Sequence, residues 1–82
     1  MAFTAELLAE VELLALFDLD NHQSGLKVHH DAADSTGAAA QRLHAKGLIS
    51  QADGGYLTSL GLDAAEHAQG LLTILRSATA PA

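Results

Sequence analysis

Cationic and hydrogen-bonding side chains gather in the middle of the chain, where they could contact phosphate groups or base edges. Three of the four Lys and Arg residues fall between positions 24 and 58, and the fourth is Arg76. Ammonium and guanidinium groups bind phosphate oxygens, and hydroxyl and amide groups donate to phosphates or bases. The candidate nucleic-acid contacts are Lys27, Ser35, Thr36, Gln41, Arg42 and Lys46.

The acidic residues are distributed differently. The net charge of -6 argues against indiscriminate nucleic-acid binding. Residues 1–23 carry five carboxylates and no Lys or Arg, residues 59–82 sum to -1, and residues 24–58 sum to zero. The middle segment is therefore the part best able to approach a polyanion. Two interpretations of its basic residues stay open, a shared groove-facing surface or scattered solubilising charge.

The histidines do not form a recognisable metal motif. His29 and His30 are adjacent, so they cannot share one face of a helix. The chain has no cysteine and no His-x-x-x-His pair, and the spacing of the other candidate ligands is generic. We therefore expect no metal and no cofactor. Those other candidate ligands are His22, Asp31 and His44.

No catalytic motif is present either. No serine stands in a nucleophile elbow, and Asp53-Gly54-Gly55 lacks the spacing and the lysine of a phosphate loop. His67 follows the apolar side of the last predicted helix, so we expect it to be packed or interfacial. The sequence predicts a protein that is not an enzyme.

The first helix is predicted to start after Thr4, an N-cap residue flanked by the hydrophobic staple pair Phe3 and Leu8. Leu13 and Phe17 fall outside its apolar stripe, on the side shared with Glu6 and Glu10. They can pack under the following loop or form part of a dimer face, and we favour the loop. The stripe itself is Leu7, Leu8, Val11, Leu14 and Ala15.

Turn-forming residues occupy positions 18–25. A short second helix is then predicted over residues 26–33, although the alternation of Leu26 and Val28 with polar residues would also suit the start of a strand. Asp34 or Ser35 is expected to cap a third helix that ends near Lys46. Gly47 stands where a glycine ends a helix.

A tight hairpin is predicted over residues 48–58, because Asp53-Gly54 lies between two short apolar runs. We expect positive φ at Gly54, Gly55 or both. Thr58 or Ser59 should cap the last helix, and residues 77–82 read as a flexible tail. On that helix Leu60, Ala64, Ala68, Leu71 and Leu75 share one face, and Asp63, Glu66, Gln69 and Thr73 lie opposite.

This order of elements resembles the winged helix-turn-helix, a mainly α fold with a short β-hairpin. The resemblance is most specific over residues 43–61, where Lys46-Gly47-Leu48-Ile49 and Asp53-Gly54-Gly55-Tyr56-Leu57-Thr58 resemble the end of a recognition helix and a wing. It implies DNA binding by helix three. Two features depart from DNA-binding relatives. The wing tip carries Asp53, and the outer face of helix three has few side chains that could read bases. That face is Ser35, Ala38, Arg42 and Ala45.

The whole chain also resembles a family of short uncharacterised gammaproteobacterial proteins, through Gly25-Leu26-Lys27-Val28-His29-His30 and the run from Lys46 to Gly61. That resemblance implies a bacterial cytoplasmic protein. The acidic first residues do not suit a signal peptide, and the longest apolar run, 13–17, is too short to span a membrane. We expect one domain over residues 1–76.

Two functions follow from these patterns. The first is a small DNA-binding module, such as a transcriptional regulator, and the alternative is a winged-helix protein-interaction module, an adaptor or inhibitor, that does not bind DNA. The apolar surface is large for so small a chain, which predicts a homodimer through the first and last helices. We expect no membrane partner.

Overall fold

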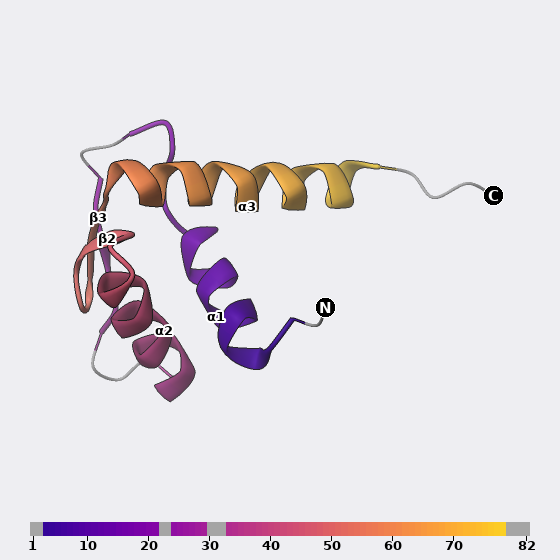
Figure 1. The fold of residues 1–82 in the computed structure, drawn as a ribbon. Coiled ribbons are helices and arrows are strands. Elements are labelled where there is room, and N and C mark those ends of the chain that lie inside the picture. The colour runs from indigo at the N-terminus through magenta and orange to yellow at the C-terminus, as the bar shows by residue number, and fades with distance from the viewer. Residues whose placement is uncertain (1–2, 22–23, 30–32, 79–82) are drawn as a thin grey trace.

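The computed structural model describes residues 3–21, 24–29 and 33–78. Over these residues it has three helices and a small three-stranded antiparallel sheet, which confirms the prediction of a mainly α domain with a short hairpin (Figure 1). The elements in chain order are α1 (Ala5–Leu14), β1 (Leu26–Lys27), α2 (Asp34–Ala45), β2 (Ile49–Gln51), β3 (Gly54–Leu57) and α3 (Ser59–Ser77).

Threonine hydroxyl groups cap the N-termini of two helices, as predicted. Thr4 Oγ1 accepts a hydrogen bond from the Leu7 amide at 3.1 Å, and Thr58 Oγ1 accepts one from the Gly61 amide at 3.0 Å. The predicted cap of α2 was wrong, because Asp34 is already helical and the N-cap position is Ala33, which makes no side-chain bond. The Asp34 carboxylate instead lies in the first turn, where the helix dipole favours a negative charge.

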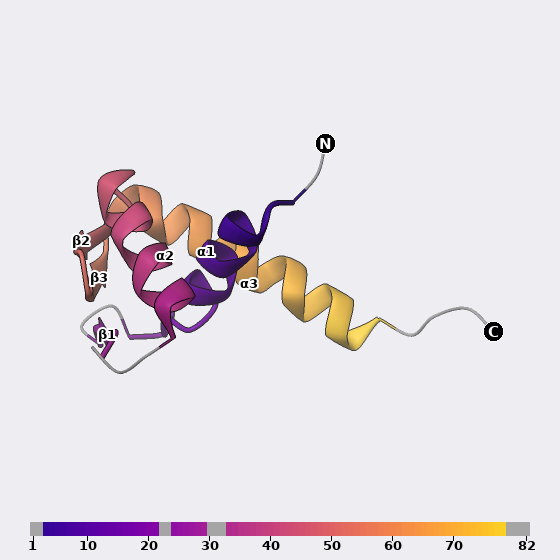
Figure 2. The ribbon, with the colours of Figure 1, turned by 90° about the horizontal axis from the view of Figure 1, so that it is seen from below.

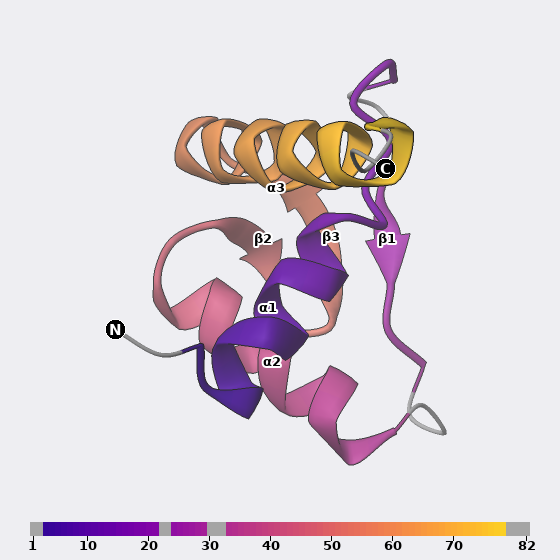
Figure 3. The same cartoon turned by 90° about the vertical axis from the view of Figure 1, so that its right-hand side faces the viewer.

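The sheet has the order β1-β3-β2, which is visible in Figure 3. Leu26 is paired with Gly55, so the predicted second helix does not begin at Leu26; the alternative of a strand there is confirmed. Residues 30–32 of that predicted helix lie outside the described residues. The hairpin is confirmed, with φ of 126° at Gly54 and 78° at Gly55. A Cβ on Gly54 would overlap the carbonyl of Leu26.

The core forms where the three helices meet β2. Leu13 and Phe17 are buried in it, so the interpretation of these two residues as a dimer face was wrong. Leu7 and Leu8 of the predicted stripe are instead about half exposed. The buried hydrophobic residues are Leu13, Leu14, Phe17, Ala39, Ala40, Leu43, Ile49 and Ala65.

Helix α3 packs on the rest of the molecule through small residues. Gly61 and Ala65 are buried, and a Cβ on Gly61 would overlap the carbonyl oxygen of Leu48. Gln69, predicted to lie opposite the apolar face, donates to the carbonyl oxygens of Leu14 and Phe17 at 3.2 and 2.7 Å. The C-terminal half of α3 then projects beyond α1 and α2 (Figures 1 and 2).

Candidate nucleic-acid interface

The structure divides the six predicted nucleic-acid contacts between different surfaces. Ser35 and Gln41 are exposed on α2, Thr36 is half-buried, and Lys27 lies on β1. Arg42 was expected on the outer face of its helix together with Ser35, but this was wrong. The side chain of Arg42 turns toward α1, where it is partly buried between the two helices. Lys46, just after α2, turns toward the same helix.

A single carboxylate receives both of these cations. Arg42 Nε donates to Glu10 Oε2 at 3.1 Å, and Lys46 Nζ donates to Glu10 Oε1. Arg42 Nη2 also donates to the carbonyl oxygen of Glu6 at 3.1 Å. The Glu10 side chain is only 7% exposed, so α1 holds one buried anion against the two cations of the α2 segment.

The ionisation of Glu10 follows from this arrangement. Burial alone would raise the pKa of the carboxyl group, but the hydrogen bonds and positive charges of Lys46 and Arg42 outweigh it and lower the pKa. Glu10 is therefore ionised at neutral pH and cancels one of the two positive charges. A buried carboxylate of this kind strongly favours keeping both partners, because an unpaired buried charge is costly.

Lys27, the third cation, is also paired. Its Nζ donates to Asp53 Oδ2 at 2.7 Å and so links β1 to the β2–β3 turn. This hydrogen bond and the lysine charge lower the pKa of Asp53. Both side chains are largely exposed, so the pair is screened by solvent and a competing anion could open it.

A shallow groove of about 510 Å³ lies between α2 and the sheet. The Lys27–Asp53 pair and His29 line one side, and Gly37, Ala38 and Gln41 line the other. Asp34 also faces the groove, which therefore holds two carboxylates and one ammonium group among these residues. Its electrostatic character does not suit a phosphate backbone.

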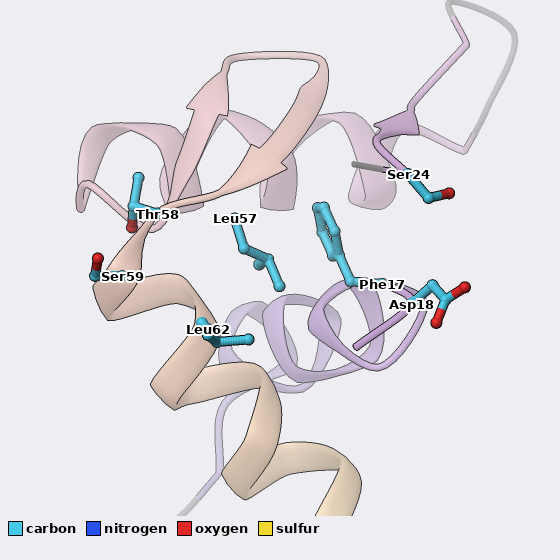
Figure 4. A pocket seen from close by; sticks show the side chains of 7 residues that line it. All are labelled: Phe17, Asp18, Ser24, Leu57, Thr58, Ser59 and Leu62. Carbon is cyan, nitrogen blue, oxygen red and sulfur yellow. The ribbon is translucent and has the colours of Figure 1, made fainter. Parts of the chain in front are cut away.

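A second, smaller pocket lies where the segment that follows α1 meets β3 and the start of α3 (Figure 4). Phe17, Leu57 and Leu62 form its apolar wall, and Asp18 lies at its edge. The hydroxyl of Thr58 is already used, because it donates to Gly47 O at 2.7 Å and caps α3. The volume of about 170 Å³ is smaller than that of typical ligand sites, about 300–1,000 Å³.

The three histidines that the structure describes form no metal-binding group. His29, His44 and His67 are exposed, whereas His22, His30 and Asp31 lie outside the described residues. Within the described ranges, no group of three His, Asp or Glu side chains is placed to hold a metal ion. Among those same residues, no helix combines the length and apolar character needed to cross a membrane.

The sequence analysis missed the role of Glu10, although a signal was present. Glu10 stands at i, i+3, i+4 and i+7 spacing with Leu13, Leu14 and Phe17, and all four are buried. This spacing marks the true core face of α1. A carboxylate on such a buried face requires a cationic partner. Arg42 and Lys46 were available as partners.

Comparisons with known proteins assign no activity to this chain. No curated protein and no solved structure matches the chain. One family model matches residues 1–76, which is nearly the whole sequence. The chain therefore belongs to a family of unknown function, DUF5669.

Proposed function

We propose that this chain is a winged-helix protein-interaction module whose function does not require DNA binding. The observation that carries the proposal is the pairing of Lys27, Arg42 and Lys46 with carboxylates of the same chain. Phosphate contacts supply most non-specific DNA affinity, and they depend on cations that are free to displace counterions. Here each candidate cation already has an anionic partner.

Two of these pairs would be expensive to exchange for phosphate. If Arg42 and Lys46 turned outward to DNA, the buried carboxylate of Glu10 would lose its hydrogen-bond donors. The surface left on α2 consists of small or acidic residues with Ser35, Gln41 and His44, which offers few side chains for reading base edges.

Apolar exposure supports a protein partner. Leu7 and Leu8 on α1, and Leu71, Ile74 and Leu75 on α3, are large hydrophobic side chains that remain 42–64% exposed. Clustered exposure of this kind marks interaction surfaces in small soluble domains. The interaction surface then lies on the helices and not on the hairpin.

A second candidate, a small DNA-binding regulator, is favoured by the arrangement of the elements. The order β1-β3-β2, with α2 directly before the β2–β3 hairpin, suits a winged helix-turn-helix in which α2 would be the recognition helix. Ser35 and Gln41 would then read bases, with Lys27 as a phosphate contact after its pair with Asp53 opens.

Fluorescence anisotropy on mixed-sequence duplex DNA at low salt separates the two candidates. The wild-type chain should show no saturable binding. Lys27→Ala and Arg76→Ala are the matched pair of variants, because each removes one exposed cationic group. Saturable wild-type binding that Lys27→Ala weakens more than Arg76→Ala would overturn the proposal in favour of the regulator.

Affinity capture from cell extract, with and without nuclease, supplies the positive test. We expect proteins to remain bound to the chain after nuclease treatment. The Leu71→Gln variant, in which only an exposed apolar side chain is changed, should no longer capture them. Capture that disappears with nuclease and is unaffected by Leu71→Gln would contradict the interaction module.

A further inference from the structure

Three shallow hollows join into one groove between α1 and α2. The hollow nearest the start of α1 shares Ala9 and Ser35 with the middle hollow. The middle hollow shares Leu13, Leu16 and Thr36 with a third, which extends to β1. Their volumes are about 220, 220 and 190 Å³ in this order. We call this continuous feature the α1–α2 groove.

Helical spacing places the α1 side of this groove on one face of the helix. Ala5, Ala9, Glu12 and Leu13 stand at i, i+4, i+7 and i+8, and Leu16 follows in the turn after the helix. The 11 residues from the first of these to the last span about 17 Å at the helical rise. The groove is therefore long enough for several side chains of a bound segment.

The third hollow has an apolar character. Leu16 is 65% exposed although it borders both this hollow and the middle one. Leu26 and Val28, which are only partly buried, line the hollow from the β1 side, and Lys27 and His29 also border it. An apolar side chain placed here would cover Leu16 and would be removed from water itself, so burial favours it.

The other two hollows present negative charge. Glu6 borders the first hollow and Glu12 the middle one, and both residues are exposed. Neither carboxylate forms an ion pair with another residue that the structure describes. Arg42 and Lys27, which also border the groove, are each paired with a carboxylate of the same chain. The charges left uncompensated along the groove are therefore anionic, which favours a cationic occupant.

We propose that the α1–α2 groove binds an extended segment of a partner protein, with Lys or Arg side chains beside Glu6 and Glu12 and an apolar side chain in the third hollow. Side chains on one face of an extended chain recur every two residues, so three of them span about 13 Å, which suits three successive hollows. A second copy of this chain fits the charge less well, since its net charge is -6 and residues 1–23 contain no Lys or Arg. The inference goes beyond the proposed function, because no residue of α3 borders this groove.

An NMR titration of the isotope-labelled chain with a synthetic peptide tests the groove. The probe is the blocked peptide Lys-Ser-Lys-Ser-Leu-Ser-Lys-Ser-Lys, which offers the cation, cation, apolar order in either chain direction. We expect saturable shifts of the amide signals of Ala9, Glu12, Leu16 and Val28. The affinity should fall as the salt concentration rises, because exposed charges are screened. The same peptide with Glu in place of each Lys should not bind.

Variants of the chain separate the groove from general acidity. Glu12→Gln should weaken the lysine peptide about two- to fivefold, which is the range for one exposed ion pair. Leu16→Ser should weaken it at least about fivefold through lost apolar contact. Glu66→Gln is the matched control, because it also neutralises one exposed carboxylate but lies on α3, and it should leave the affinity unchanged. Circular dichroism of each variant shows whether the fold is retained.

Three results would overturn this inference. They are the absence of saturable shifts at low salt, equal binding of the Lys and Glu peptides, and equal weakening by Glu12→Gln and Glu66→Gln. Shifts at the groove when the chain alone is concentrated would assign it to a second copy and overturn it as well. Leu71→Gln separates the two proposals, since it should leave peptide binding unchanged. Peptide binding without Leu71-dependent capture supports the groove alone, whereas capture without peptide binding supports the proposed function alone.

Discussion

The α1–α2 contact buries a charged side chain, whereas the projecting half of α3 leaves large apolar side chains exposed. Between α1 and α2, Arg42 and Lys46 converge on a carboxylate that is almost completely buried. Along α3, Leu71, Ile74 and Leu75 remain in solvent although small residues of the same helix are buried. The charged contact therefore lies inside the protomer, while the apolar surface stays exposed and is the part that we propose to meet a partner.

The largest expected effect comes from the packed end of α3. Gly61→Ala should destabilise the chain by about 3 kcal/mol, because the new methyl group would overlap the backbone of Leu48 and force α3 away from the hairpin. Urea unfolding followed by circular dichroism measures the change. A loss below about 1 kcal/mol would show that this end of α3 is not tightly packed and would weaken the contrast between its halves.

The buried ion pairs give the next effect. Glu10→Gln should cost about 2 kcal/mol, since a neutral amide keeps the shape but loses two charge-assisted bonds. Arg76→Ala is the control, because Arg76 is exposed at the end of α3, and it should change stability very little. Equal effects of the two changes would mean that the Glu10 contact contributes no more than surface charge.

The pH dependence sharpens the same point. The folded-state pKa of Glu10 is lowered from its ordinary value of 4.5, so its contribution is fully present above that value and is lost as the pH falls through the folded-state pKa. Stability should therefore decrease below about pH 4.5 in the wild type, and less steeply in Glu10→Gln. Identical slopes for both chains would assign the acid sensitivity to other carboxylates.

The smallest expected effect, of opposite sign, lies in the open half of α3. Gly70→Ala should stabilise the protomer by about 0.5–1 kcal/mol, because it raises helix propensity without meeting any neighbour. The measurement is thermal unfolding at a concentration low enough to keep the chain monomeric. A destabilised chain would instead place Gly70 in a contact within the protomer.

Local chemistry was predictable from the sequence, and the rotation of the helices about their axes was not. The Thr4 and Thr58 caps, the end of α2 at Gly47 and the Asp53-Gly54 hairpin were all correct, because each depends on a few adjacent residues. The buried face of α3 was harder to identify. Alanine and glycine pack against the core there, while the larger leucines, which dominate a hydrophobic pattern, face outward.

The candidate site failed for a related reason. Arg42 was placed on the outer face from its helical spacing with Ser35 and Ala38, and only the buried acid on α1 reverses that expectation. Glu10 and Arg42 are 32 positions apart, so their pairing depends on how α1 crosses α2. No local pattern specifies that crossing.

The Thr58 hydroxyl also bears on the order in which the chain folds. It bonds Gly47 O and the Gly61 amide, while the Thr58 amide donates to Leu48 O at 3.1 Å. These bonds close a loop of only 11 residues. The ion pairs of Glu10 and the side-chain hydrogen bond from Gln69 to Leu14 O join positions 32 to 55 residues apart. Short loops close at lower entropic cost. We expect the α2–hairpin–α3 junction to assemble first and the docking of α1 to limit the folding rate.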